Sequence, residues 1–105
     1  MEEENKSLEI KQTKEGSVLT CSLKGWLDPN TSPDLLLKLH LDDVSELIID
    51  MKQVEYVFSA GLRAFLQIQR IMEAQNGSVK LVNVSDSIRS IFEYTGFEGL
   101  LEKKA

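Results

Sequence analysis

The sequence predicts an α/β fold built on a mixed β-sheet. Near its start, apolar and polar residues alternate over 8–13 and 19–24, on either side of a short turn that contains a glycine. This pattern is typical of an antiparallel hairpin with one buried face. Further on, an apolar strand within 47–57 leads into a helical pattern and then a second strand at 79–82. Strands connected by a helix in this way run parallel, so the sheet is at least partly parallel.

Length and composition predict one small domain. The chain has 105 residues, of which 42% are hydrophobic and 28% charged, ordinary values for a globular protein. We expect a single domain over 1–105, in which 1–6 form a frayed, charged lead-in and 102–105 a solvent-exposed tail.

The charge pattern narrows the class of partner. The net charge is -5 and the basic residues are scattered, which argues against nucleic acid or an anionic membrane and favours a protein partner. The apolar runs are too short to span a bilayer, and the acidic start MEEENKS does not resemble a signal peptide, so we expect a cytoplasmic protein. The single Cys21 falls on an apolar strand face, where a buried hydrophobe is the expected role. No Cys or His pair has metal-ligand spacing, and we expect neither metal nor cofactor.

The hairpin is followed by a loop and a short helix. The loop carries two prolines, and Thr31 or Ser32 before Pro33 forms a good helix start, so we expect a helix from there to Leu39. Asp28 suits either a turn cap or a binding role. Trp26 suits either a partly buried anchor at the strand end or a contact for a partner.

The chain is organised around residues 47–77. The apolar residues between 47 and 57 predict a strand that is buried on both faces. A sharp corner at Ser59-Ala60-Gly61 follows and leads into an amphipathic helix. Ser59 occupies the expected N-cap position, where its hydroxyl would accept a backbone N–H. Arg63 lies one turn further along on the polar face. Strand, helix and solvent meet at this corner, so we expect function there.

The last part of the chain predicts one more helix. Ser85 is the expected cap, Ile88 and Phe92 face the core, and Gly96 ends the helix. Leu100 and Leu101 are expected to pack the tail.

Three stretches in this order carry a family resemblance. They are GWLD at 25–28 before a Thr/Ser-rich loop, LIID at 47–50 leading to VFSAGLR at 57–63, and IFEYTGF at 91–97. Together they resemble the STAS domain, and more narrowly the small single-domain anti-sigma factor antagonists of bacteria. The resemblance covers residues 8–101. It implies a STAS-like fold, a mixed sheet of about four to five strands with about three to four helices packed mainly on one face.

The resemblance also implies a non-enzymatic role in partner switching. In such antagonists the serine at the position of Ser59 is phosphorylated by an ATP-binding serine kinase of the anti-sigma factor class. The unphosphorylated form binds that kinase and frees the sigma factor, and a PP2C-like phosphatase resets the cycle. A weak homodimer is compatible with this role. The residues then expected to bind the partner are Asp28, Trp26, Thr31, Phe58, Ala60, Gly61 and Arg63.

Two departures from the family pattern favour an alternative. Phe58 stands where many members have Asp, and Trp26 where an acidic residue is common. The alternative is a STAS scaffold, or a subunit of a sensory or lipid-transport complex, in which Ser59 only caps its helix. A third reading, a small α/β enzyme or nucleotide-binding protein, has little support, because the sequence lacks phosphate-loop, nucleophile-elbow and HExxH motifs.

Overall fold

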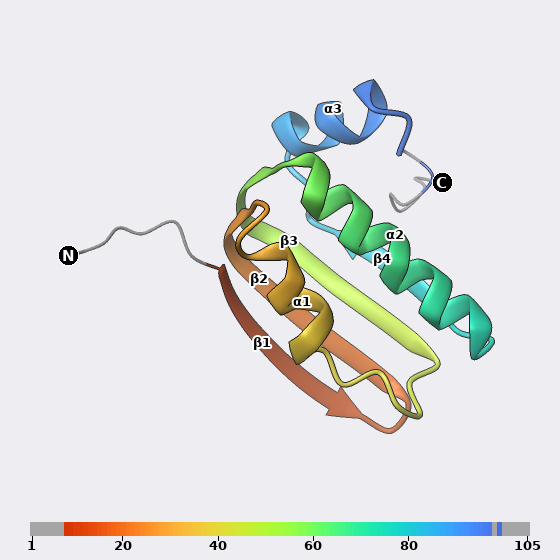
Figure 1. The fold of residues 1–105 in the computed structure, drawn as a ribbon. Helices are drawn as coiled ribbons and strands as arrows, with labels where there is room; N and C mark the ends of the chain where they lie inside the picture. Colours follow the sequence, from red (N-terminus) through yellow and green to blue (C-terminus); the bar gives the residue numbers. More distant parts are fainter. Residues whose placement is uncertain (1–7, 98, 100–105) are drawn as a thin grey trace.

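The structure, a computed structural model, describes residues 8–97 and 99 (Figure 1). Within them lie four strands and three helices: β1 Leu8–Glu15, β2 Val18–Leu27, α1 Ser32–Lys38, β3 Glu46–Val57, α2 Ser59–Ala74, β4 Ser78–Val82 and α3 Asp86–Tyr94. The predicted lead-in, the tail and the packing of Leu100 and Leu101 lie outside the described residues.

The strands form one mixed sheet in the order β1-β2-β3-β4. β1 and β2 form the predicted antiparallel hairpin, while β2 with β3 and β3 with β4 are parallel. Each parallel pair is connected by a helix, α1 or α2. The predicted mixed α/β sheet is therefore confirmed.

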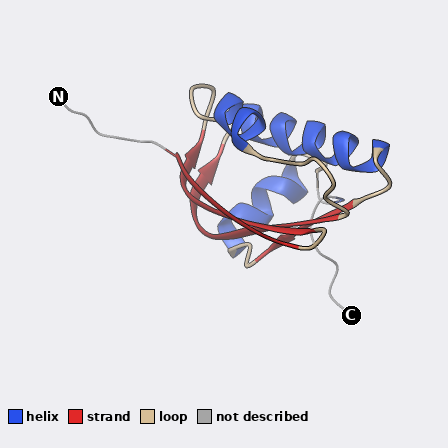
Figure 2. Cartoon of the chain, turned by 90° about the horizontal axis from the view of Figure 1, so that it is seen from below, coloured by secondary structure: helices blue, strands red, loops and turns tan. Residues whose placement is uncertain are grey.

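The helices cover one face of the sheet. α1 and α2 lie side by side over the strands in Figure 1, and Figure 2 shows the long helix on one side of the strand layer. α3 packs beside β3, where its Phe92 ring lies 6.0 Å from that of Phe65 in α2. The core beneath the helices is apolar, and its largest fully buried side chains include Phe65, Phe92, Leu23, Leu47, Ile49, Met51, Ile68 and Leu81.

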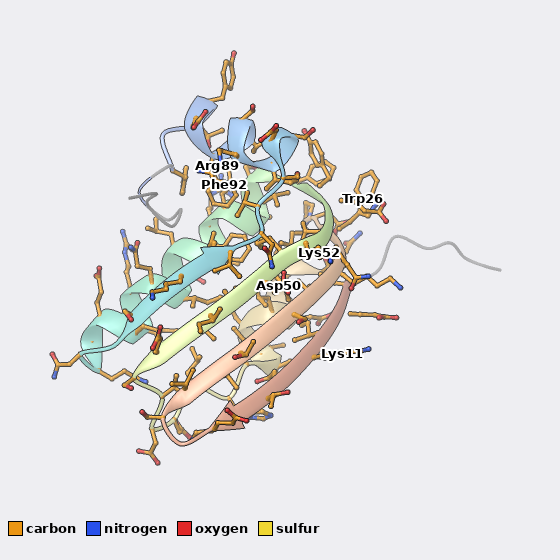
Figure 3. All side chains as sticks on the ribbon, turned by 180° about the vertical axis from the view of Figure 1, so that it is seen from behind. Lys11, Trp26, Asp50, Lys52, Arg89 and Phe92 are labelled. Atoms are coloured by element: carbon orange, nitrogen blue, oxygen red, sulfur yellow. The ribbon has the colours of Figure 1, made fainter. Side chains whose placement is uncertain are left out.

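The expectation that the central strand is buried on both faces is wrong. In β3, Leu47 and Ile49 are buried, whereas Ile48 and Asp50 between them are only half-buried. Figure 3 views this other face of the sheet, on which Asp50 is labelled. Because the helices cover one face only, every second side chain in this part of β3 remains near solvent.

β3 does not keep strict alternation to its end. Ser22 pairs with Asp50, but two residues later in β2 the pairing partner lies three residues later in β3, at Gln53. A second extra β3 residue follows, because Gly25 pairs with Val54 and Trp26 with Tyr56. Extra residues of this kind re-aim side chains. After Met51 the buried positions therefore come at every third residue, Val54 and Val57.

Candidate partner-binding site

The corner between β3 and α2 is held by the end of β2. The N–H of Phe58 donates to the carbonyl of Leu27 at 2.8 Å. The Phe58 carbonyl in turn accepts the first helical hydrogen bonds of α2, from Gly61 at 2.9 Å and Leu62 at 3.1 Å. One residue thus ends the strand and starts the helix.

Phe58, not Ser59, is the N-cap of α2, so the predicted capping role of Ser59 is wrong. Phe58 has the extended backbone of an N-cap, with ψ 172°, and none of the described side chains caps the helix. The hydrogen bond to Leu27 fixes Phe58 in this conformation, and Ser59 then becomes the first helical residue. Ser59 is exposed, and its hydroxyl forms no hydrogen bond with the described residues.

Gly61 lets α2 approach β2 closely. A Cβ atom at this position would lie 2.8 Å from the Leu27 Cβ, 3.0 Å from a Val57 methyl carbon and 3.2 Å from the Leu27 carbonyl oxygen. Gly61 is buried. Its contribution to the predicted site is thus to position the first turn of α2.

Asp28 and Thr31 hold the loop between β2 and α1. The Asp28 Oδ1 atom accepts hydrogen bonds from the N–H of Asn30 at 2.8 Å and of Thr31 at 2.9 Å. The Thr31 hydroxyl donates to the Trp26 carbonyl at 2.7 Å and accepts from the Asp28 N–H at 3.0 Å. The turn-capping role foreseen for Asp28 is confirmed. Thr31 does occupy the N-cap position of α1, but its hydroxyl forms no cap hydrogen bond because it turns back to the strand end.

Three rings form what we call the aromatic cluster, Trp26, Tyr56 and Phe58. Their centroids lie 4.7 Å apart for Tyr56 and Phe58, 5.8 Å for Trp26 and Phe58, and 5.9 Å for Trp26 and Tyr56. The Trp26 Nε1 donates to a Glu55 carboxylate oxygen at 3.1 Å. Tyr56 is 43% and Phe58 37% exposed, whereas Trp26, which is labelled in Figure 3, is half-buried. The partly buried position foreseen for Trp26 is confirmed, and its contact with a partner stays a prediction.

Tyr56 is the member of the cluster that sequence reasoning missed as a site residue. Tyr56 and Phe58 are two residues apart on an extended chain, a spacing that places them on one face. The sequence alone therefore indicated that the Tyr56 and Phe58 side chains share a face. The pairing of Tyr56 with Trp26 was not foreseeable, because it depends on the extra residues in β3.

A shallow groove of about 270 Å³ lies between α1 and α2, next to Ala60, the residue that follows Ser59. Two predicted site residues, Ala60 and Arg63, line it together with Pro29, Ser32, Pro33, Leu36, Ala64 and Gln67. The residues adjoining Ser59 thus belong to two features, since Phe58 lies in the aromatic cluster and Ala60 in the groove. Asp28 supports the loop between them.

The polar groups around Ser59 favour an anion. The first turn of α2 contains no acidic residue, and the N–H groups of a helix's first turn have no helical acceptor and carry partial positive charge. Arg63 follows one turn later and makes no ion pair with any described residue. This end of α2 can therefore accept a phosphate on Ser59.

The described part of the chain has neither a metal-binding group nor a membrane-spanning helix. Residues 8–97 and 99 contain no group of three or more His, Cys, Asp or Glu placed to bind a metal ion. None of their helices has the length and apolar character needed to cross a bilayer. Cys21 is fully buried, as predicted, and burial raises the pKa of its thiol to about 12.

Comparison with known proteins gives consistent results. A family model described as "Mlab, STAS domain" matches residues 10–102. The anti-sigma-B factor antagonist of Bacillus subtilis is 28% identical over 103 residues, which are 96% of this chain and 93% of that protein.

Solved structures with the same fold include two of SpoIIAA, an anti-sigma factor antagonist. The unphosphorylated form superimposes with a TM-score of 0.79 at 20% identity, over 92% of this chain and 89% of that one. The phosphorylated form, described as a Bacillus cell fate determinant, gives a TM-score of 0.70 at 20% identity, over 92% of both chains.

Proposed function

The chain belongs to the STAS domain family, and from this membership we propose that it is an anti-sigma factor antagonist switched by phosphorylation at Ser59. In its unphosphorylated form it binds an anti-sigma factor that is also an ATP-dependent serine kinase. The kinase transfers the γ-phosphoryl group of ATP to the Ser59 oxygen, with release of ADP and of the hydroxyl proton. A PP2C-like phosphatase hydrolyses the phosphoserine and restores the binding form.

The position of Ser59 is the observation that carries this proposal. Ser59 is exposed and begins α2. Its side chain makes no capping hydrogen bond that phosphorylation would break. A phosphate there would carry about -1.5 to -2 charges and lie beside the positive end of α2. Phosphorylation would change the charge of the surface while leaving the corner's backbone hydrogen bonds intact.

The proposed partner surface consists of the residues around Ser59. Phe58 offers an exposed ring and Trp26 a half-buried one. Ala60 and Arg63 line the groove, and aromatic and Arg side chains often dominate binding energy. Thr31, Asp28 and Gly61 hold these residues in place. Support for such a partner comes from the relatives, which are named anti-sigma-B factor antagonists.

The aromatic cluster favours a second candidate function, a STAS scaffold or complex subunit that is not phosphorylated. The ring of Phe58 lies directly before Ser59 and packs on Trp26 at 5.8 Å. A constitutive apolar contact at this place would need no phosphate. In that case Ser59 would simply begin the helix.

Intact-protein mass spectrometry with site mapping separates the two functions. The protein is incubated with ATP and with each candidate serine kinase encoded by the same genome. We expect one added phosphate on Ser59, which is lost in Ser59→Ala and retained in Ser87→Ala. Ser87→Ala is a matched control because Ser87 is also an exposed serine in the first turn of a helix. A kinase that binds the protein but adds no phosphate to Ser59 would contradict the switch and favour the scaffold.

A further inference from the structure

A buried hydroxyl beside the groove has no hydrogen-bond partner among the described residues. Ser32 is 3% exposed, and its Oγ forms no hydrogen bond in the structure. Its backbone N–H donates to the Asp28 carbonyl at 2.9 Å, so the unpaired donor of Ser32 is its side-chain hydroxyl. Buried hydroxyls are normally hydrogen-bonded, and an unpaired one is unfavourable for the folded chain. Ser32 also lines a groove, so an acceptor brought by a bound molecule would satisfy its Oγ.

The other residues that line the groove indicate which kind of molecule would carry that acceptor. Most of its lining is apolar, from two prolines, Leu36 and two alanines. Arg63 and Gln67 add polar groups, and neither makes a hydrogen bond or an ion pair with the described residues. Apolar walls with a few unpaired polar groups are typical of a site that binds an amphipathic group.

We propose that this groove is the anchor pocket for the protein partner. A segment of the partner inserts one aliphatic side chain between α1 and α2, and the backbone carbonyl or carboxylate next to that side chain accepts from Ser32 Oγ and Arg63. This inference rests on the proposed function, because it names where the partner is held.

Size, charge and position all favour a protein segment as the occupant. At about 270 Å³ the groove is smaller than the roughly 300–1,000 Å³ of ordinary small-molecule pockets, yet it has room for one aliphatic side chain. Arg63 and the positive end of α2 complement an acidic or carbonyl group. Ala60, which lines the groove, directly follows Ser59, so an occupant of the groove touches the proposed switch.

The first test uses a small probe and the full chain. Amide shifts are followed by NMR during titration with N-acetyl-L-leucine, which has an aliphatic side chain beside a carboxylate, and with N-acetyl-L-alanine as matched probe. We expect the leucine probe to shift amides that line the groove and the alanine probe to bind several-fold more weakly. Ser32→Ala should weaken the leucine probe about three- to tenfold, whereas Leu37→Ala, on the exposed side of α1, should have no effect. Absent or scattered shifts, or equal binding by Ser32→Ala, would overturn the inference.

The second test uses the kinase that phosphorylates or binds the protein, measured by calorimetry. Ser32→Ala should weaken this complex about three- to tenfold, and Ala60→Leu, which fills the groove, should weaken it further. If Ser59→Asp weakens the complex while both groove variants bind like wild type, the groove inference fails and the proposed function stands. If no candidate kinase binds but the leucine probe still occupies the groove, the proposed function fails and the groove remains a binding site.

Discussion

Gly61 sets, at the scale of a single residue, how closely α2 approaches β2. Alanine is usually the better helix former, by about 0.5–1 kcal/mol. Here its Cβ would meet the Leu27 Cβ at 2.8 Å and the Leu27 carbonyl oxygen at 3.2 Å, and overpacking of this kind typically costs about 1–3 kcal/mol. We predict that Gly61→Ala lowers the free energy of unfolding by about 1–2 kcal/mol, measured by urea denaturation.

A control for Gly61→Ala is available in the same turn. Ser59→Ala also introduces alanine into the first turn of α2, but at an exposed position, so its stability should stay close to wild type. Equal or increased stability of Gly61→Ala would show that α2 can move away from β2 without cost.

Cys21 makes stability depend on pH in the alkaline range. Burial raises the pKa of its thiol from 9.0 to about 12, so between these values the unfolded chain loses a proton that the folded chain keeps. The contribution is fully present below pH 9 and is lost as pH rises toward 12, by up to about 1.4 kcal/mol per pH unit. We predict that the stability advantage of wild type over Cys21→Ala shrinks between pH 9 and 11, measured by denaturation at each pH. A constant difference would contradict this prediction.

At the scale of elements, the loop between β2 and α1 depends on one carboxylate. Asp28 accepts two backbone hydrogen bonds, at 2.8 and 2.9 Å, and Asp28→Ala would remove both. We predict a loss of about 1–2 kcal/mol in the free energy of unfolding, measured by thermal or urea denaturation.

Asp28→Asn separates the structural role of Asp28 from a binding role. Asparagine keeps an acceptor oxygen and the shape of the side chain but removes the charge, so its stability should lie near wild type. If the complex with the kinase nevertheless weakens, Asp28 contacts the partner through its charge. Unchanged affinity in Asp28→Asn would limit Asp28 to holding the loop.

The elements show which features a sequence pattern can predict. The hairpin and the parallel crossover follow from local periodicity, and both are confirmed. Two features of β3 do not follow from it. Ile48 looks as apolar as its neighbours, and only the arrangement of helices on one face leaves it half-buried. The extra residues around Lys52 and Glu55 are visible only once β3 is paired with β2.

The candidate site, like the fold, could be predicted only in part from the sequence. The corner at Ser59 was located because a strand, a glycine and a helix meet there. The helix start was missed by one residue, since the hydrogen bond between the Phe58 N–H and the Leu27 carbonyl joins segments far apart in sequence. The groove was missed altogether, because α1 and α2 contribute to it together and no motif in either helix describes their contact.

At the scale of the whole molecule, the proposed switch changes charge without changing the fold. Ser59→Asp imitates part of this change. An acidic residue in the first turn of α2, which has none, should interact favourably with the helix dipole by about 0.3–1 kcal/mol. Arg63 lies four residues further, and an Asp–Arg pair at this spacing adds about 0.2–0.5 kcal/mol. We therefore expect Ser59→Asp to be as stable as wild type or slightly more stable.

The same substitution should weaken the complex with the kinase at least tenfold, a loss of about 1.4 kcal/mol or more, because the introduced carboxylate would engage Arg63 and place negative charge where the partner's acceptor binds. A double-mutant cycle with Arg63→Ala measures this coupling. Ser59→Asp should cost less affinity in the Arg63→Ala background than in wild type, while NMR spectra show shifts confined to the first turns of α2. Equal losses in both backgrounds would mean that the charge acts on the partner directly and that Arg63 takes no part in the switch.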